Sequence, residues 1–183
     1  MLDKNYRSKK AGLMSFNAKE FYESNLGVGT NIGEVDEAYE VINVDGEWIN
    51  QVNKKELNKM LEILDDNLKK YEKIILLTLN KSQENELNNL ILKKGIYDEL
   101  LKENLLVVRS LEQVQGDEAD LVIISVGYDK NAKLGSTYVA RNGGRNALNV
   151  ALSRAKDKLI VIKSIYGNEV IPSGTKDMIS FAK

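Results

Sequence analysis

The sequence predicts an α/β fold in which a mainly parallel sheet is covered by helices on both faces. Five short apolar runs rich in β-branched residues are spread along the chain, as is typical of strands that are buried on both faces. These runs are residues 41–44, 74–79, 105–108, 121–126 and 159–162. Helical patterns alternate with them, and this alternation indicates parallel strands that are joined by helical crossovers.

The helical patterns lie between the predicted strands. The first is a set of apolar residues at helical spacing with charged residues between them, namely Leu57, Met60, Leu61, Leu64 and Leu68. A second set follows one element later at Leu87, Leu90 and Ile91. Residues 11–25 are expected to form an opening helix, and residues 27–37 a glycine-containing loop. We expect one domain over residues 1–183, with residues 164–183 as a peripheral tail.

Composition limits the chemistry that the chain can perform. The sequence has no cysteine and no histidine, which excludes disulfides, thiolate or imidazole metal sites and any Ser-His-Asp triad, and we expect no metal site. No apolar run approaches the roughly 20 residues that span a bilayer, and no signal-peptide pattern opens the chain. We therefore expect a cytoplasmic protein without a membrane partner. Because the net charge is only −1, any nucleic-acid binding must come from a local patch.

A loop for binding nucleoside triphosphates is absent from the sequence. Such a loop has the pattern G-x-x-x-x-G-K-[S/T], because backbone amides and the lysine must surround the phosphates. The glycines at 27, 29 and 33 have the wrong spacing, and we interpret them as part of a surface loop. The chain is therefore not expected to hold a triphosphate and its magnesium ion by itself.

Three segments carry the most specific patterns. They are residues 2–8 (Leu-Asp-Lys-Asn-Tyr-Arg-Ser), 113–120 (Gln-Val-Gln-Gly-Asp-Glu-Ala-Asp) and 149–156 (Asn-Val-Ala-Leu-Ser-Arg-Ala-Lys). In this order they resemble motifs IV, V and VI of superfamily 1 DNA/RNA helicases. The resemblance runs from residue 2 to residue 164. It implies the second, C-terminal RecA-like domain of such a motor, which has the P-loop NTPase type of fold without its own P-loop.

The resemblance assigns roles in ATP hydrolysis to residues of these motifs. Arg7 and Arg154 would be the catalytic arginines at the γ-phosphate, and Gln115, Gly116 and Glu118 would face the nucleotide. A glycine lets a backbone amide approach a ligand closely, and a glutamate can accept hydrogen bonds from a ribose or position water. The alternative is that the acidic residues of this segment only solubilise a loop before a core strand.

Arginine is rare in this chain. Of its 26 basic residues five are arginines, at positions 7, 109, 141, 145 and 154, which indicates sites where the planar bidentate fork is required. The steps of four between Ala147, Ala151 and Ala155 predict a helix packed against the sheet, with Arg154 on it. Arg154 could alternatively extend to solvent. Many superfamily 1 helicases have two arginines at the positions of Asn146 and Ala147. The resemblance therefore assigns no role to these two residues of this chain.

A further segment follows the predicted strand at 74–77. Residues 78–83, Thr-Leu-Asn-Lys-Ser-Gln, lie where ligands gather in open α/β sheets and resemble another helicase motif. Together with Ser110, where motif V begins, Thr78 and Asn80 are predicted to contact the nucleic-acid backbone. The alternative is that this segment only begins the next helix.

The implied function is that of the C-terminal motor domain of an ATP-dependent DNA/RNA helicase. ATP with Mg²⁺ would be bound mainly by an N-terminal RecA-like partner domain outside this chain, and the substrate would be single-stranded DNA or RNA. Without Walker A and B motifs, the isolated chain is expected to hydrolyse no ATP. Two alternatives are a stand-alone, catalytically inactive module of the same fold that binds nucleic acid or a partner, and an α/β domain for another phosphate ligand.

Overall fold

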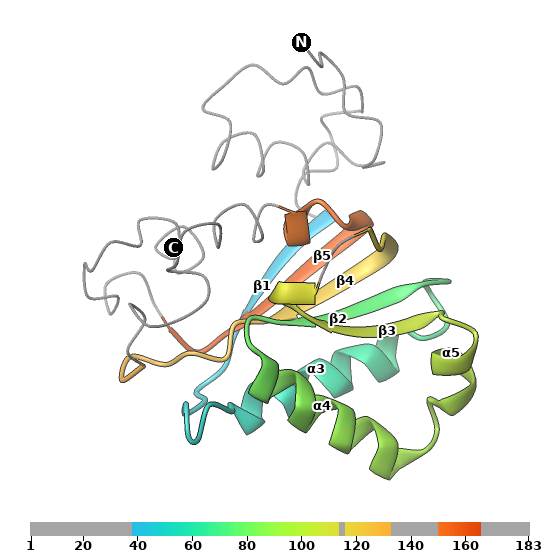
Figure 1. Cartoon of the computed structure of the whole chain (residues 1–183). Helices are drawn as coiled ribbons and strands as arrows, with labels where there is room; N and C mark the ends of the chain where they lie inside the picture. The colour runs from blue at the N-terminus through green and yellow to red at the C-terminus, as the bar shows by residue number, and fades with distance from the viewer. Residues whose placement is uncertain (1–37, 114–115, 133–149, 166–183) are drawn as a thin grey trace, which may run out of the picture.

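The computed structural model describes residues 38–113, 116–132 and 150–165. Within these ranges five strands form one sheet, in the order β1-β5-β4-β2-β3. They are β1 Tyr39–Asn43, β2 Ile74–Thr78, β3 Leu106–Ser110, β4 Ala119–Ser125 and β5 Ala155–Lys163. Every neighbouring pair in this sheet is parallel, which confirms the predicted α/β class with a mainly parallel sheet (Figure 1).

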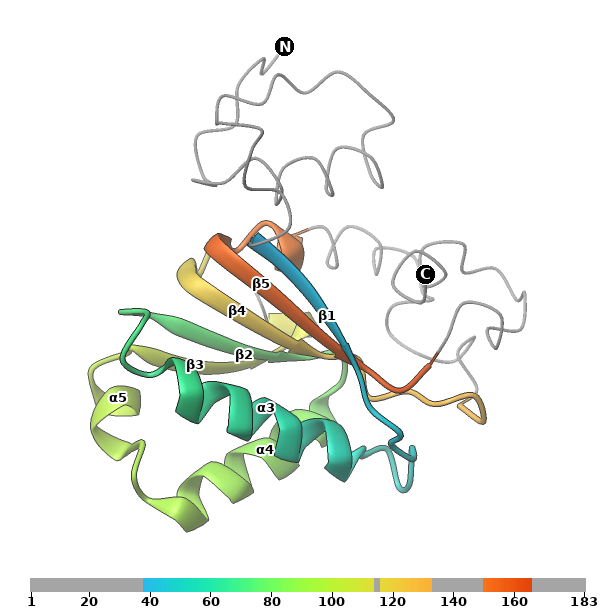
Figure 2. The same cartoon turned by 180° about the vertical axis from the view of Figure 1, so that it is seen from behind.

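The helices in the described residues are α3 Lys54–Asn67, α4 Lys81–Lys94 and α5 Asp98–Lys102, and a 3-10 turn spans Leu111–Gln113. An asparagine caps the N-terminus of each long helix. Asn53 Oδ1 accepts from the backbone N–H of Glu56 at 3.2 Å, and Asn80 Oδ1 accepts from that of Gln83 at 2.9 Å. α4 ends at Gly95, whose φ of +66° is the left-handed conformation that glycine adopts without strain. Both long helices lie on the same face of the sheet (Figures 1 and 2).

The core has one layer on each face of the sheet. On the helix-covered face, strand residues such as Leu76 and Ile123 pack against Leu57 and Leu87 of the two helices. On the opposite face, Ile75, Leu77, Val122 and Ile124 pack with Ala151 and Leu152 of the short helical segment 150–152. Complete burial of one such aliphatic side chain contributes roughly 1.5–3 kcal/mol to stability. The central strands are therefore buried on both faces, as the apolar runs predict.

β1 departs from that prediction. It pairs only with β5 among the described strands, and it lies at the edge of the sheet. Val41 is 38% exposed, whereas all five residues of the central strand β2 are buried. This difference in exposure follows from the order of the strands in the sheet. That order cannot be predicted from the apolar pattern of a single strand.

The carboxyl edge of the sheet is polar on the helix-covered face. Thr78, Ser110 and Ser125 are the last residues of β2, β3 and β4, and Ser164 follows β5. Thr78 is in register with both Ser110 and Ser125 on the neighbouring strands. A row of hydroxyl groups therefore runs along this edge, at the end of the sheet where α3 and α4 begin.

Some predictions fall outside the described residues, namely those for the helix at 11–25 and the loop at 27–37. Of the helices in the part that the structure describes, none has the length and apolar character that a membrane-spanning segment requires.

Candidate functional site

The predicted site residues that the structure describes lie at opposite edges of the sheet. Arg154 directly precedes β5, and Gly116 and Glu118 directly precede β4, so all three lie at the amino edge of those strands. Thr78, Asn80 and Ser110 lie at the carboxyl edge, where β2 and β3 end and α4 begins. Arg7 and Gln115 lie outside the described residues.

Arg154 lies in a turn and not on a helix, which corrects the prediction from the alanine spacing. Residues 150–152 are helical, and the backbone N–H of Arg154 donates to Ala151 O at 3.2 Å. Its own carbonyl accepts from Ala119 N at 3.1 Å, and Ala155 then pairs with Ala119 as the first residue of β5. The helix must end before Ala155 because that residue already belongs to the sheet.

The guanidinium of Arg154 is held between this turn and the motif V loop. Nε donates to Val150 O at 2.9 Å, Nη2 to Ser153 Oγ at 3.3 Å and Nη1 to Asp117 O at 3.5 Å. The contact with Val150 satisfies a carbonyl at the end of the helical segment, where carbonyls lack partners within the helix. Arg154 is only 7% exposed, so the alternative that it extends to solvent is not supported.

The motif V loop has a conformation that requires glycine at position 116. Gly116 has a φ of +86°, in the left-handed region where other residues are strained. Two ion pairs join the loop to β3 and β5: Asp117 Oδ2 lies 3.4 Å from Arg109 Nε, and Glu118 Oε2 lies 3.9 Å from Lys156 Nζ. The motifs in the sequence assign no role to Arg109, although the scarcity of arginine marks it as a candidate for such a pairing.

At the carboxyl edge, two buried polar atoms in the described part of the chain have no hydrogen-bond partner. They are Asn80 Nδ2 and Ser110 Oγ. Leaving such an atom unsatisfied costs about 1–3 kcal/mol, so its presence requires an explanation. Thr78 is fully buried and donates its hydroxyl to Asn80 O at 2.9 Å. Nearby, the half-exposed Lys81 donates to Gln113 Oε1 at 3.3 Å, and its charge is paired with Glu84 Oε2 at 2.7 Å.

A buried carboxylate, which no sequence motif predicts, lies at the same edge. Glu56 in the first turn of α3 has 0% exposure. Its Oε2 accepts from Ser125 Oγ and from Gly127 N, each at 2.7 Å, and its Oε1 accepts from Ser164 Oγ at 2.8 Å. Burial raises the pKa of the Glu56 carboxyl to about 7, although these hydrogen bonds act to lower it.

The hydrogen bonds continue from Glu56 to the first turn of α4. Gln83 Nε2 donates to Ser125 Oγ at 2.7 Å, and Gln83 Oε1 accepts from Asn53 N at 2.7 Å. Asn53 Nδ2 donates to Gly127 O at 3.0 Å and to Ser164 Oγ at 2.9 Å. We call Asn53, Glu56, Gln83, Ser125, Gly127 and Ser164 the edge network. It joins the N-termini of α3 and α4 to the ends of β4 and β5.

The spacing Asn53-x-x-Glu56 could have suggested part of this network. It has the form of a capping box, in which a polar N-cap and an acidic residue three positions later satisfy free backbone N–H groups. In the structure, however, both carboxylate oxygens are engaged mainly by residues of β4, β5 and the segment after β4. The sequence indicates the helix start but not these partners.

Comparison with known proteins identifies the family. The AAA domain family AAA_12 matches residues 34–166, which is more than half of the chain. This chain belongs to that family. It is 30% identical over 187 residues to the uncharacterized ATP-dependent helicase MG140 of Mycoplasma genitalium, and 30% identical over 182 residues to the MG140 homolog of Mycoplasma pneumoniae. These matches cover 92% and 90% of this chain but only 16% of each relative.

A solved structure confirms the fold of this AAA domain. The C-terminal domain of a possible DNA helicase from Lactobacillus plantarum aligns with a TM-score of 0.58, over 96% of this chain and 97% of that one. The two sequences are only 14% identical, so this likeness concerns the fold alone. The family match and the relatives named as ATP-dependent helicases confirm the resemblance to helicases.

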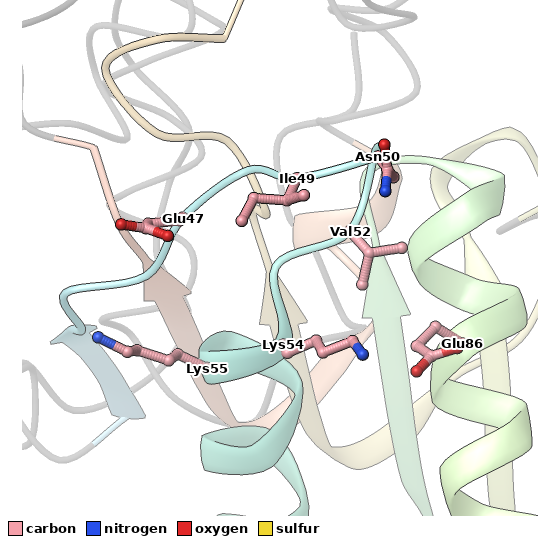
Figure 3. A pocket seen from close by; sticks show the side chains of 7 residues that line it. All are labelled: Glu47, Ile49, Asn50, Val52, Lys54, Lys55 and Glu86. Carbon is pink, nitrogen blue, oxygen red and sulfur yellow. The ribbon is translucent and has the colours of Figure 1, made fainter.

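A shallow groove beside the carboxyl edge of the AAA domain is formed by a tight turn. Ile49 and Val52 exchange two backbone hydrogen bonds of 3.0 Å around Asn50 and Gln51, whose φ angles are +51° and +65°. The groove next to this turn has a volume of about 480 Å³ and is lined by Glu47, Ile49, Asn50, Val52, Lys54, Lys55 and Glu86 (Figure 3). Two lysines and two glutamates balance one another there, so its charge favours no anionic ligand.

Nor do the described residues of this domain offer a magnesium site of their own. Over those ranges the structure contains no group of three acidic side chains that could hold a metal ion. The chemistry at the amino edge is instead that of a guanidinium beside a glycine-containing loop.

Proposed function

We propose that this AAA domain is the C-terminal motor domain of an ATP-dependent superfamily 1 DNA/RNA helicase. In this proposal ATP and Mg²⁺ are bound mainly by an N-terminal RecA-like domain, and the present domain completes the site from the other side. The absence of a P-loop from the sequence supports this division of roles. The bound nucleotide supplies the phosphate that is transferred to water, and Mg²⁺ neutralises charge on its oxygens.

The packing of Arg154 against the motif V loop carries the proposal. The contact between Arg154 Nη1 and Asp117 O places the guanidinium beside the glycine whose backbone can approach a ligand. Arg154 and Arg7 would stabilise charge on the transferring γ-phosphate, while Gln115, Gly116 and Glu118 face the nucleotide. An arginine in such a role contributes about 10³ to 10⁵ in rate.

The carboxyl edge would form part of the nucleic-acid track. Asn80 Nδ2 can only donate and the Ser110 hydroxyl can also donate, so both fit the acceptor oxygens of a backbone phosphate. Because both atoms are buried in the chain alone, the strand would displace the groups that cover them. Thr78 would act by holding the Asn80 carbonyl, since its hydroxyl is already donated there.

ATPase kinetics of the helicase that contains this domain test the proposal. Arg154→Lys keeps the charge but loses the planar fork, so kcat should fall by about two orders of magnitude or more with little change in KM. Arg141→Lys, at an arginine without an assigned role, is the control and should change neither constant. Near-normal ATPase activity of Arg154→Lys would refute the assignment of Arg154 to the γ-phosphate.

A further inference from the structure

The edge network reaches the proposed nucleic-acid track through Gln83, whose side chain is bound by Ser125 Oγ and by Asn53 N. Ser125 Oγ donates to Glu56 Oε2 and at the same time accepts from Gln83 Nε2, both at 2.7 Å. The backbone N–H of Gln83 in turn donates to Asn80 Oδ1 at 2.9 Å. A continuous path therefore leads from the fully buried Glu56 to the side-chain amide of Asn80.

The same hydrogen bond determines which way the Asn80 amide points. Because Oδ1 is held by Gln83 N, Nδ2 must point away from the helix, where it lacks a partner among the described residues. The Gln83 side chain is fixed at both ends, by Ser125 Oγ and by Asn53 N at 2.7 Å. The first turn of α4 is therefore attached to β4 and to the start of α3, and its orientation depends on these attachments.

We propose that Glu56, Ser125 and Gln83 are positioning residues that hold the Asn80 amide toward the nucleic-acid track. This inference rests on the proposed function, because it assumes that Asn80 contacts the strand. Glu56 anchors the path since it is also bound by Gly127 N and Ser164 Oγ and cannot turn with α4. Loss of the Ser125 hydroxyl leaves Gln83 Nε2 without its acceptor and frees the first turn of α4 to shift.

The structure supplies a matched control for this proposal. Ser125 and Ser164 each donate one hydroxyl hydrogen bond to Glu56, at 2.7 and 2.8 Å. Only Ser125 also contacts Gln83, whereas Ser164 accepts from Asn53 Nδ2. Ser125→Ala and Ser164→Ala therefore remove equivalent bonds from the carboxylate, but only Ser125→Ala also removes a direct hydrogen bond to Gln83.

The test is an NMR titration of the ¹⁵N-labelled 183-residue chain with a single-stranded oligothymidylate and, in a separate experiment, with an oligouridylate. Asn80→Ala identifies the Asn80 side-chain amide signals by their loss. In Ser125→Ala these signals should shift before any oligonucleotide is added, and the affinity should fall about fivefold, as for loss of one hydrogen bond. The two variants should have similarly lowered melting temperatures. In Ser164→Ala, however, the Asn80 signals and the affinity should be unchanged.

Unchanged Asn80 signals and affinity in Ser125→Ala, or equal changes in Ser164→Ala, would overturn the inference. If Ser125→Ala does not fold, Gln83→Glu makes the same test, because it keeps an acceptor for Asn53 N and loses the donor to Ser125. Failure of the proposed function gives a different result, namely wild-type affinity in Asn80→Ala. In that case the Asn80 signals of Ser125→Ala still decide whether the network orients the amide, although the amide would then have no role in binding.

Discussion

Replacement of Glu56 by glutamine should remove a pH dependence of stability that the buried carboxyl creates. Glutamine has the same shape as the protonated acid: its oxygen can accept from Ser125 and Gly127, and its amide can donate to Ser164 Oγ. The pKa of Glu56 rises from 4.5 to about 7 on folding. The folded state therefore keeps a proton that the unfolded state loses between these two pH values. Stability from this group is lost as pH rises through that interval and stays constant above it.

The size of the effect follows from the two pKa values. Between about pH 5 and about pH 8, this shift lowers the free energy of unfolding of the wild type by about 2.5 kcal/mol relative to a group that does not titrate. Other carboxyl groups also titrate, but they cancel when the variant is compared with the wild type at each pH. Urea unfolding followed by circular dichroism should therefore show Glu56→Gln gaining about 2.5 kcal/mol on the wild type between these conditions. Parallel stability curves for the two proteins would refute the reasoning.

Two other predictions concern the glycines and the isolated chain. Gly116→Ala and Gly95→Ala both place a side chain at positive φ with open space around it, so each should cost about 1 kcal/mol in thermal unfolding. In the parent helicase only Gly116→Ala should reduce ATPase activity, and equal activity of the two variants would contradict a nucleotide contact at Gly116. The isolated chain should show no ATP hydrolysis in a phosphate-release assay, and its binding to single strands in fluorescence anisotropy should be weak and should weaken further with salt. Measurable turnover, or tight binding that salt does not affect, would favour an independent module.

The fold could be predicted from the sequence because its signal is local. The five apolar runs mark β1 to β5 to within a few residues, except that β5 begins earlier, at Ala155. That difference also explains the wrong prediction for Arg154. The alanine spacing 147, 151, 155 satisfies a helical period, but pairing of Ala155 with Ala119 in the sheet competes with the helix and ends it.

The edge network could not be predicted, because its contacts join distant parts of the chain. Glu56 and Ser164 are 108 positions apart, and Glu56 and Ser125 are 69 apart. In the sequence these polar residues resemble ordinary helix starts and strand ends. They become buried partners only because the strand order brings the ends of β4 and β5 next to the first turn of α3. The motif residues at the amino edge were found by resemblance, whereas this network needed the tertiary structure.

In the proposed function this domain presents Arg154 to the γ-phosphate of an ATP held by another domain. A structure of the complete helicase with Mg²⁺, ADP and aluminium fluoride, which mimics the transferring phosphoryl group, would show whether it does. We predict that the Arg154 guanidinium lies within about 3 Å of a fluoride of that group, the distance of a charge-assisted hydrogen bond. A closed motor domain in which Arg154 keeps its contacts with Val150, Ser153 and Asp117, with another residue at the fluoride, would contradict it.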